Sequence, residues 1–201
     1  MRIETIPERK IELYTFNELE DSVKEKVLDR FREWDVTDNF WSEAVIEDVT
    51  EIASIMGITI DNVYWSGFWS QGDGACFEGS FEYKKGSVEE IKSNYPTDKE
   101  LISISKAYRA EQKKFFYKLY GTVKHRGHYY HELCTVIDII HEDYSPYAVV
   151  VTDLDEVLRR FMQWVYSRLE TEYDYLTSDE YLTERIPEFD YEFTKDGETY
   201  E

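Results

Sequence analysis

The stretch from residue 64 to residue 77 (YWSGFWSQGDGACF) constrains the fold strongly, because it places aromatic side chains beside closely spaced glycines. Gly72, Gly74 and Gly79 mark positions where the backbone can adopt a positive φ or approach another segment closely. The flanking residues 59–65 and 75–83 are typical of strands. We therefore expect two strands joined by a structured loop.

Periodicity in the rest of the chain predicts further elements. Alternation predicts a strand at residues 11–16, and β-forming residues predict strands at 115–124 and 130–141. Apolar residues at helical spacing predict helices that begin near residues 17, 39, 87, 97, 153 and 178. Asn17 and Glu20 have the spacing of a capping box. The long helix from Asp153 has a core stripe of Leu154, Val157, Leu158, Phe161, Trp164, Val165 and Leu169.

The order of these elements predicts the fold class. Two hairpins adjacent in sequence favour an antiparallel sheet over a parallel nucleotide-binding sheet. We predict an α+β fold, with an antiparallel sheet of about four to five strands, helices packed against it and a long C-terminal helix. We expect a single α+β domain over residues 1–188, followed by residues 189–201 as an acidic tail or an edge strand.

The charge is strongly negative and unevenly distributed. The formal net charge is −20, yet residues 84–126 carry more basic than acidic side chains. An overall field of this sign repels nucleic acid and favours a basic protein surface. The helix expected after residue 39 carries an acidic row, which is either a solvated face or a protein-contact surface: Glu43, Glu47, Asp48 and Glu51.

The chain shows no signs of export or membrane insertion. Its first residues are polar, and it contains no apolar run of membrane-spanning length. Cys76 and Cys134 are isolated cysteines in expected strands, so we interpret them as buried thiols in a reducing compartment. We therefore expect a cytoplasmic protein.

The Gly-rich centre suggests two roles. It is not a phosphate loop, because it precedes a strand, contains Asp73 and lacks the GxxxxGK[ST] pattern. It is either a hairpin turn in which Asp73 hydrogen-bonds its own backbone, or a binding surface. The candidate binding residues are Trp65, Phe68, Trp69, Gln71 and Asp73. We predict that at least one of the three rings is exposed or lines a cleft.

All four histidines lie between residues 125 and 141. Three spaced by two residues, with Cys134 nearby, suggest a zinc site, but no CxxC or HExxH pattern supports it. The alternatives are an exposed structural turn or a basic-aromatic hairpin tip that stacks bases or holds a nucleotide. The candidate residues of such a tip are His125, Arg126, His128, Tyr129, Tyr130 and His131. We expect no metal, no cofactor and no catalytic residues.

The helix expected after residue 97 has a basic outer face of Lys99, Lys106, Arg109, Lys113 and Lys114. These side chains either balance nearby acids or contact a small anionic ligand. The sequence alone leaves both interpretations open.

Three motifs give the chain a family resemblance. They are residues 66–75 (SGFWSQGDGA), 124–131 (KHRGHYYH) and 173–180 (YDYLTSDE), together with the opening residues 14–19 (YTFNEL). They resemble a family of phage- and prophage-encoded proteins commonly labelled "antitoxin of toxin–antitoxin stability system". The likeness spans nearly the full length. It implies a small phage-type protein in a bacterial cytoplasm and supplies no catalytic residues.

Two functional hypotheses follow. The first is a non-enzymatic, antitoxin-like or anti-defence protein of the anti-restriction or anti-CRISPR class. It would bind and neutralise a bacterial toxin or defence nuclease with a basic surface, through acidic surfaces of its own. It would not bind nucleic acid or membrane directly, and it would be a monomer or a homodimer. The second is a small-ligand protein that binds a nucleotide between the aromatic hairpin and the His/Arg/Tyr tip. An enzyme has less support, because no nucleophile or carboxylate pair stands out.

Overall fold

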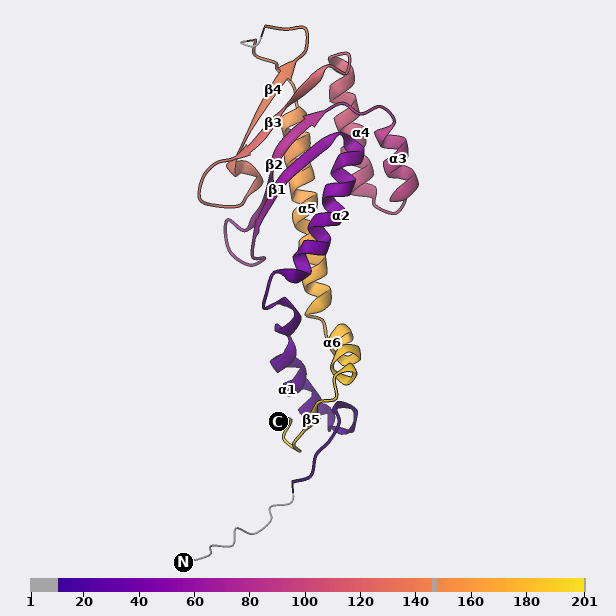
Figure 1. Cartoon of the computed structure of the whole chain (residues 1–201), viewed down its shortest axis with the longest axis vertical. Helices are drawn as coiled ribbons and strands as arrows, with labels where there is room; N and C mark the ends of the chain where they lie inside the picture. Colours follow the sequence, from indigo (N-terminus) through magenta and orange to yellow (C-terminus); the bar gives the residue numbers. More distant parts are fainter. Residues whose placement is uncertain (1–10, 146–147, 201) are drawn as a thin grey trace, which may run out of the picture. The chain divides into compact units, whose positions relative to one another are not determined.

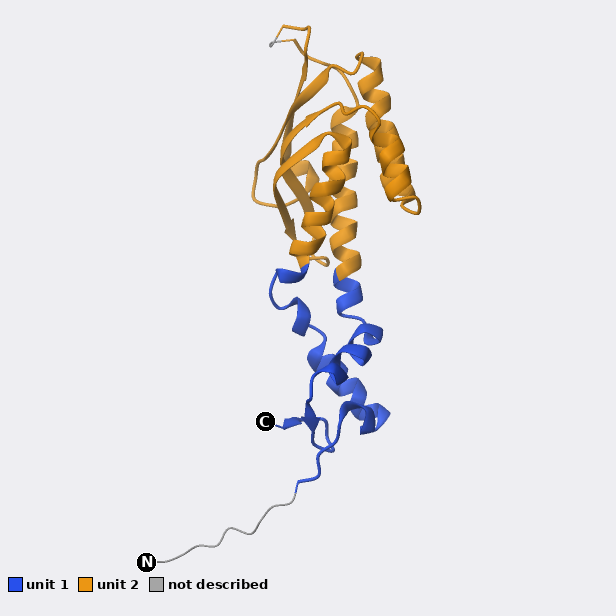
Figure 2. Cartoon of the chain, turned by 45° about the vertical axis from the view of Figure 1, so that its right-hand side comes forward, with its two compact units in different colours: residues 1–41, 173–201 blue, residues 42–172 orange. Residues whose placement is uncertain are grey.

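The computed structural model describes residues 11–145 and 148–200. Contacts divide the chain into two compact units, one of residues 1–41 with 173–201 and one of residues 42–172 (Figure 2). The predicted α+β class is confirmed, because both units combine helices with antiparallel strands. The single-domain boundary at residue 188 stays a prediction.

The sheet of residues 42–172 has four strands in the order β1-β2-β3-β4, and each pair is antiparallel. The strands are β1 (Ile58–Ser66), β2 (Gly74–Glu82), β3 (Leu119–His125) and β4 (Thr135–His141). The two hairpins expected from the sequence are therefore present, and β2 and β3 join them into one sheet.

The helices of this unit lie against one face of the sheet (Figure 1). They are α2 (Phe40–Met56), α3 (Ser87–Asn94), α4 (Lys99–Lys114) and α5 (Leu154–Leu176). The predicted stripe of α5 is buried, and its Phe161 ring contacts Phe77 of β2 with 6.1 Å between centroids. Asp98 caps α4 by accepting from the Leu101 N–H, and it also accepts from the Trp164 indole N–H. Asp98 thereby ties α4 to α5.

A single glycine joins α2 to β1. Gly57 has φ +81, a conformation that residues with a Cβ rarely adopt, and its carbonyl accepts from the Glu82 N–H. Because the link is one residue long, α2 and β1 run in opposite directions. The first turns of α2 therefore lie toward the sheet end at which β1 finishes (Figure 1).

The unit of residues 1–41 and 173–201 has its own core. Its helices are α1 (Asp21–Phe31) and α6 (Asp179–Arg185), with the 3-10 turns η1 (Phe16–Glu18), η2 (Trp34–Val36) and η4 (Ile186–Glu188). A two-stranded sheet joins β5 (Glu192–Phe193) to β6 (Thr199–Tyr200). The buried cluster comprises Phe16, Leu19, Val27, Leu28, Leu182, Ile186 and Phe193.

Several predicted boundaries are wrong. The strand expected at residues 11–16 is only a single bridge from Tyr14 to Phe193, because Thr15 and Glu18 form a capping box that starts η1 instead. This replaces the capping box expected at Asn17 and Glu20. The strand expected from residue 115 begins at Leu119, since Phe116 and Tyr117 adopt positive φ. The strand expected from residue 130 begins at Thr135, after the 3-10 turn η3 (Glu132–Cys134).

None of the helices in the described residues combines the length and apolar composition that crossing a membrane requires.

Candidate functional site

The two sequence motifs with the strongest functional signal meet at one end of the four-stranded sheet. Residues 67–73 connect β1 to β2, and residues 126–134 connect β3 to β4. Because β2 and β3 are antiparallel, the start of β2 lies at the same end as the finish of β3 (Figure 1). The structure therefore brings together two segments that are far apart in the sequence.

Asp73 holds the first loop in place. Its Oδ2 accepts hydrogen bonds from the backbone N–H groups of Trp69 (3.0 Å) and Ser70 (2.6 Å). The Asp73 N–H donates in turn to the Ser70 carbonyl at 3.0 Å. The carboxylate is thus used to fix the turn, which was one of the two interpretations of this loop.

The loop positions a row of aromatic rings. Trp65 stacks on Phe68 with 5.6 Å between ring centroids, and Phe68 lies 5.4 Å from the ring of Tyr166 on α5. Trp69 extends from this row and is 76% exposed. The prediction that one of the three rings is exposed is confirmed for Trp69. Gln71 is exposed beside it.

The second loop packs on the first. A Cβ at Gly72 would lie 3.2 Å from the Tyr129 ring, and one at Gly74 would lie 3.1 Å from the Tyr130 carbonyl oxygen. These glycines are therefore needed for close packing between the loops.

Three rings, those of Tyr64, His125 and Tyr130, pack together at the start of the second loop. Tyr130 stacks on Tyr64 at 5.4 Å, and the His125 ring lies 5.3 Å from Tyr64. The Tyr64 hydroxyl is 3.0 Å from Glu78, and this hydrogen bond raises the pKa of the phenol. His125 and Tyr130 therefore act mainly as packing groups.

The exposed side chains of the two loops, including the partly packed Tyr130, form what we call the hairpin-end surface. Its exposed members are Trp69, Arg126, His128, Tyr129, Tyr130 and Leu133. Tyr129 is 57% exposed and Leu133 is 70% exposed. Sequence reasoning missed Leu133, because the 3-10 turn that projects it outward interrupts an expected strand.

The four histidines do not gather. The His131 Nδ1 accepts from the Leu133 N–H and caps η3, whereas His141 is buried at the opposite end of β4 against Tyr144. Among residues 11–145 and 148–200, no group of three or more His, Cys, Asp or Glu side chains is arranged to hold a metal ion.

The acidic row of α2 is exposed. Glu43, Glu47, Asp48 and Glu51 lie on one side of the helix, and we call them the acidic face. None of them has an ion-pair partner within the described part of the chain, whereas Glu89, Glu100, Glu111 and Asp143 of the same unit are all paired. The acidic face is thus chemically available for contact.

Comparison with known proteins assigns most of the chain to a family. A family model described as a domain of unknown function, DUF8835, matches residues 41–179. The chain belongs to the DUF8835 family. No curated protein and no solved structure matches the chain. The DUF8835 region contains both hairpin loops and the whole acidic face.

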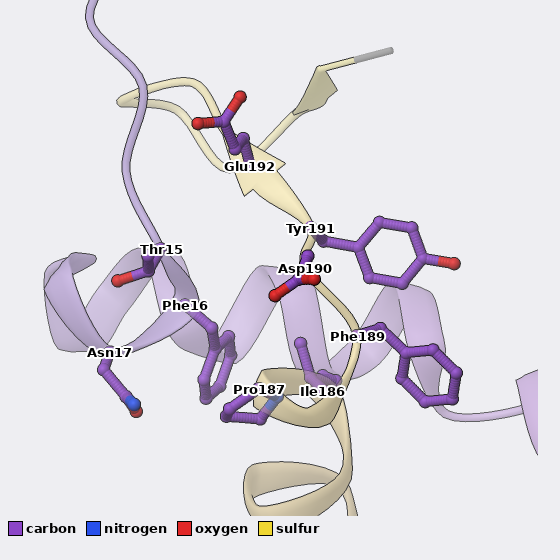
Figure 3. A pocket seen from close by; sticks show the side chains of 9 residues that line it. All are labelled: Thr15, Phe16, Asn17, Ile186, Pro187, Phe189, Asp190, Tyr191 and Glu192. Atoms are coloured by element: carbon purple, nitrogen blue, oxygen red, sulfur yellow. The ribbon is translucent and has the colours of Figure 1, made fainter.

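Outside the DUF8835 region, the unit of residues 1–41 and 173–201 holds a cavity of about 470 Å³. Figure 3 shows Phe16, Ile186 and Pro187 close together, with Phe189 and Tyr191 extending to one side. The other residues that line the cavity are polar or acidic: Thr15, Asn17, Asp190 and Glu192. Sequence reasoning missed this cavity, because two segments from opposite ends of the chain build it.

Proposed function

We propose that this chain is a non-enzymatic, phage-type protein that binds and neutralises a bacterial protein in the host cytoplasm. The target is a toxin or a defence factor of the restriction or CRISPR class. The observation that supports this proposal best is the hairpin-end surface, in which exposed aromatic side chains stand on a rigidly held pair of loops.

The composition of this surface is typical of a protein-binding site. Trp, Tyr and Arg are the residues that carry most of the binding energy at protein interfaces. Trp69, Tyr129 and Arg126 are all exposed here. The hydrogen bonds of Asp73 and the packing of Tyr129 on Gly72 fix the loops beforehand, so little ordering entropy is lost on binding.

The acidic face indicates the charge of the partner. Glu43, Glu47 and Glu51 follow one another at i, i+4 spacing, and each such like-charge pair costs a helix roughly 0.2–0.5 kcal/mol. A basic partner would offset that cost. The surfaces by which toxins and nucleases hold nucleic acid are basic, which makes such proteins suitable partners.

A nucleotide bound between the two hairpins has less support. The faces of Tyr64, Tyr130 and Phe68 are already used for stacking on neighbouring rings. A base would need a free aromatic face at this place.

The test is co-expression of the chain with individual toxins and defence nucleases in bacteria. Wild-type protein should restore growth or phage plating against its target and should bind that target after purification. The double variant Trp69→Ala, Tyr129→Ala should lose both effects. Neutralising the acidic face with Glu43→Gln, Glu47→Gln and Glu51→Gln should weaken binding and reduce its dependence on salt.

The matched control is Phe116→Ala. Phe116 is also an exposed aromatic residue of the same unit, but it precedes β3 and so lies toward the opposite end of the sheet. Its loss should leave neutralisation intact. Neutralisation that survives the double variant, or that Phe116→Ala abolishes equally, would contradict the proposal.

A further inference from the structure

A second cavity, of about 450 Å³, lies among the turn after β2, helix α3 and helix α4. It is lined by residues of the turn between β2 and α3, by Glu89 of α3, by side chains of α4 from Lys106 to Lys113, and by Tyr117 after α4. Its lining includes four basic side chains, Lys85, Lys106, Arg109 and Lys113. We call it the basic cavity, and it does not overlap the hairpin-end surface.

Three of the four basic side chains of this cavity have no ion-pair partner among the described residues. Arg109 donates to Glu89, the one acid among the lining residues, at 2.9 Å. Lys85, Lys106 and Lys113 have no carboxylate partner within the residues that the structure describes. By contrast, the neighbouring Lys114 and Lys118 are each paired with acids. Three unpaired lysines and one arginine thus gather around one cavity in a chain whose net charge is −20.

Helical spacing places three of these basic side chains on one side of α4. Lys106, Arg109 and Lys113 follow at i, i+3 and i+7, so they share a face. The helix dipole favours a cation near the C-terminal end of α4, which accounts for Lys113 but not for Lys106. An anion in the cavity would relieve their mutual repulsion.

The aromatic wall of the cavity is rigid. The rings of Tyr83 and Tyr117 pack together with 4.3 Å between centroids. Tyr117 adopts φ +64, which is uncommon for a residue with a side chain, and its N–H donates to the Gln112 carbonyl at 2.7 Å. The Gln112 side chain is buried and bonds both the N–H and the carbonyl of Leu119. These contacts fix the Tyr117 ring at the cavity, where it remains 39% exposed.

We propose that the basic cavity binds a small ligand that joins a phosphate group to a planar ring, the class to which nucleotides belong. The lysines and the remaining N–H groups of Arg109 would contact the phosphate, and the exposed face of Tyr117 would stack on the ring. The cavity volume lies within the range of small-ligand sites. The overall negative charge favours a mononucleotide over a nucleic-acid strand, whose many phosphates would be repelled.

The test is titration calorimetry on the full chain with AMP, ADP, ATP, GMP, GDP and GTP. Adenosine, guanosine and pyrophosphate probe the ring and the phosphate separately, and a short single-stranded oligonucleotide probes nucleic acid. At least one nucleotide should bind more tightly than its nucleoside and than pyrophosphate. Its affinity should fall as salt concentration rises.

Three variants locate the site. Lys106→Glu and Lys113→Glu should each weaken nucleotide binding by about tenfold or more. Tyr117→Leu should weaken the nucleotide but not pyrophosphate. The matched control is Lys99→Glu, which makes the same charge change on the same helix two turns before Lys106 and outside the cavity lining.

Three results would overturn the proposal. The first is no binding of any nucleotide at millimolar concentration, and the second is a loss of nucleotide affinity in Lys99→Glu as large as in the cavity variants. The third is tighter binding of the oligonucleotide than of every mononucleotide. Pyrophosphate binding as tightly as the best nucleotide would likewise refute recognition of the ring.

Discussion

The phenol of Tyr166 donates a hydrogen bond to the backbone carbonyl oxygen of Gly67, with 2.9 Å between the two oxygens. This bond connects the long helix α5 to the loop that carries Trp69. The Tyr166 ring also lies 5.4 Å from Phe68, so it supports the loop through both packing and hydrogen bonding. The placement of the hairpin-end surface therefore depends on a helix far away in the sequence.

Tyr166→Phe should loosen this loop without unfolding the protein. The variant keeps the ring but loses one hydrogen bond, which is worth about 0.5–1.5 kcal/mol. Backbone amides of residues 68–73 should exchange with deuterium faster, as measured by mass spectrometry. Tyr120→Phe is the control, because Tyr120 is an exposed tyrosine of β3. Unchanged protection in Tyr166→Phe would show that the bond does not hold the loop.

Gly121→Ala should destabilise the sheet strongly. A Cβ at Gly121 would lie 1.8 Å from the Asp138 carbonyl oxygen and 2.8 Å from the Phe81 ring, and both neighbours are held within the sheet or core. We expect a loss of about 3 kcal/mol in urea unfolding, at the upper end for overpacked sites. Gly86→Ala is the comparison, since its Cβ would meet nothing within 4 Å and only its φ of +88 is unfavourable. It should cost about 1 kcal/mol, the penalty of a side chain in the left-handed region. Equal losses would contradict the steric explanation.

Cys76 should resist alkylation in the folded protein. Burial raises the pKa of its thiol to about 12, so little thiolate forms near neutral pH. Iodoacetamide at pH 8 should modify Cys76 only when urea unfolds the chain, as followed by mass spectrometry. Modification of Cys76 at equal rates with and without urea would contradict its burial.

The same thiol gives stability a pH dependence. The folded state holds the proton more tightly than the unfolded state, so its contribution is present below pH 9 and is lost as pH rises towards 12. The free energy of unfolding should fall over that range, and Cys76→Ala should reduce the slope. A slope that is identical in the variant would assign the effect to other groups.

Tyr181→Phe should destabilise the unit of residues 1–41 and 173–201. The Tyr181 hydroxyl donates to Asp35 at 2.7 Å, and burial together with this carboxylate raises the pKa of the phenol to about 12. Loss of the bond should cost about 1 kcal/mol in thermal or urea unfolding. Tyr175→Phe is the matched control, because Tyr175 is exposed and contacts Tyr181 only through its ring. A loss of the same size in both variants would show that the hydroxyl bond is not the cause.

The sequence predicts the elements whose periodicity is local. The alternation at residues 59–65 and 75–83 corresponds to β1 and β2, and the apolar stripe from Leu154 to Leu169 is buried in α5. The sequence does not predict the first residue of a strand when a residue outside the alternating pattern determines where that strand begins. Gln112 stabilises the turn at Phe116 and Tyr117, and the cap at His131 starts a 3-10 turn in place of a strand.

The candidate site was predicted only in part. The number of rings in a short loop predicts that at least one of them is exposed, but the structure was needed to show that it is Trp69. The packing of Tyr129 on Gly72 requires two hairpins to run in a particular register. The basic cavity combines Tyr83 with Tyr117 and Lys85 with Lys106. No local pattern links such pairs, because the sheet and α4 bring them together only after folding.

The backbone at Phe116 and Tyr117 has a consequence for evolution and for engineering. Two successive residues with side chains hold φ of +55 and +64, where glycine or asparagine would fold at lower cost. Tyr117→Gly should therefore relieve the unfavourable backbone conformation, but it would remove both the ring packing on Tyr83 and the ring of the basic cavity. If natural variants of this domain keep an aromatic residue at this position despite that penalty, selection has acted on the ring itself.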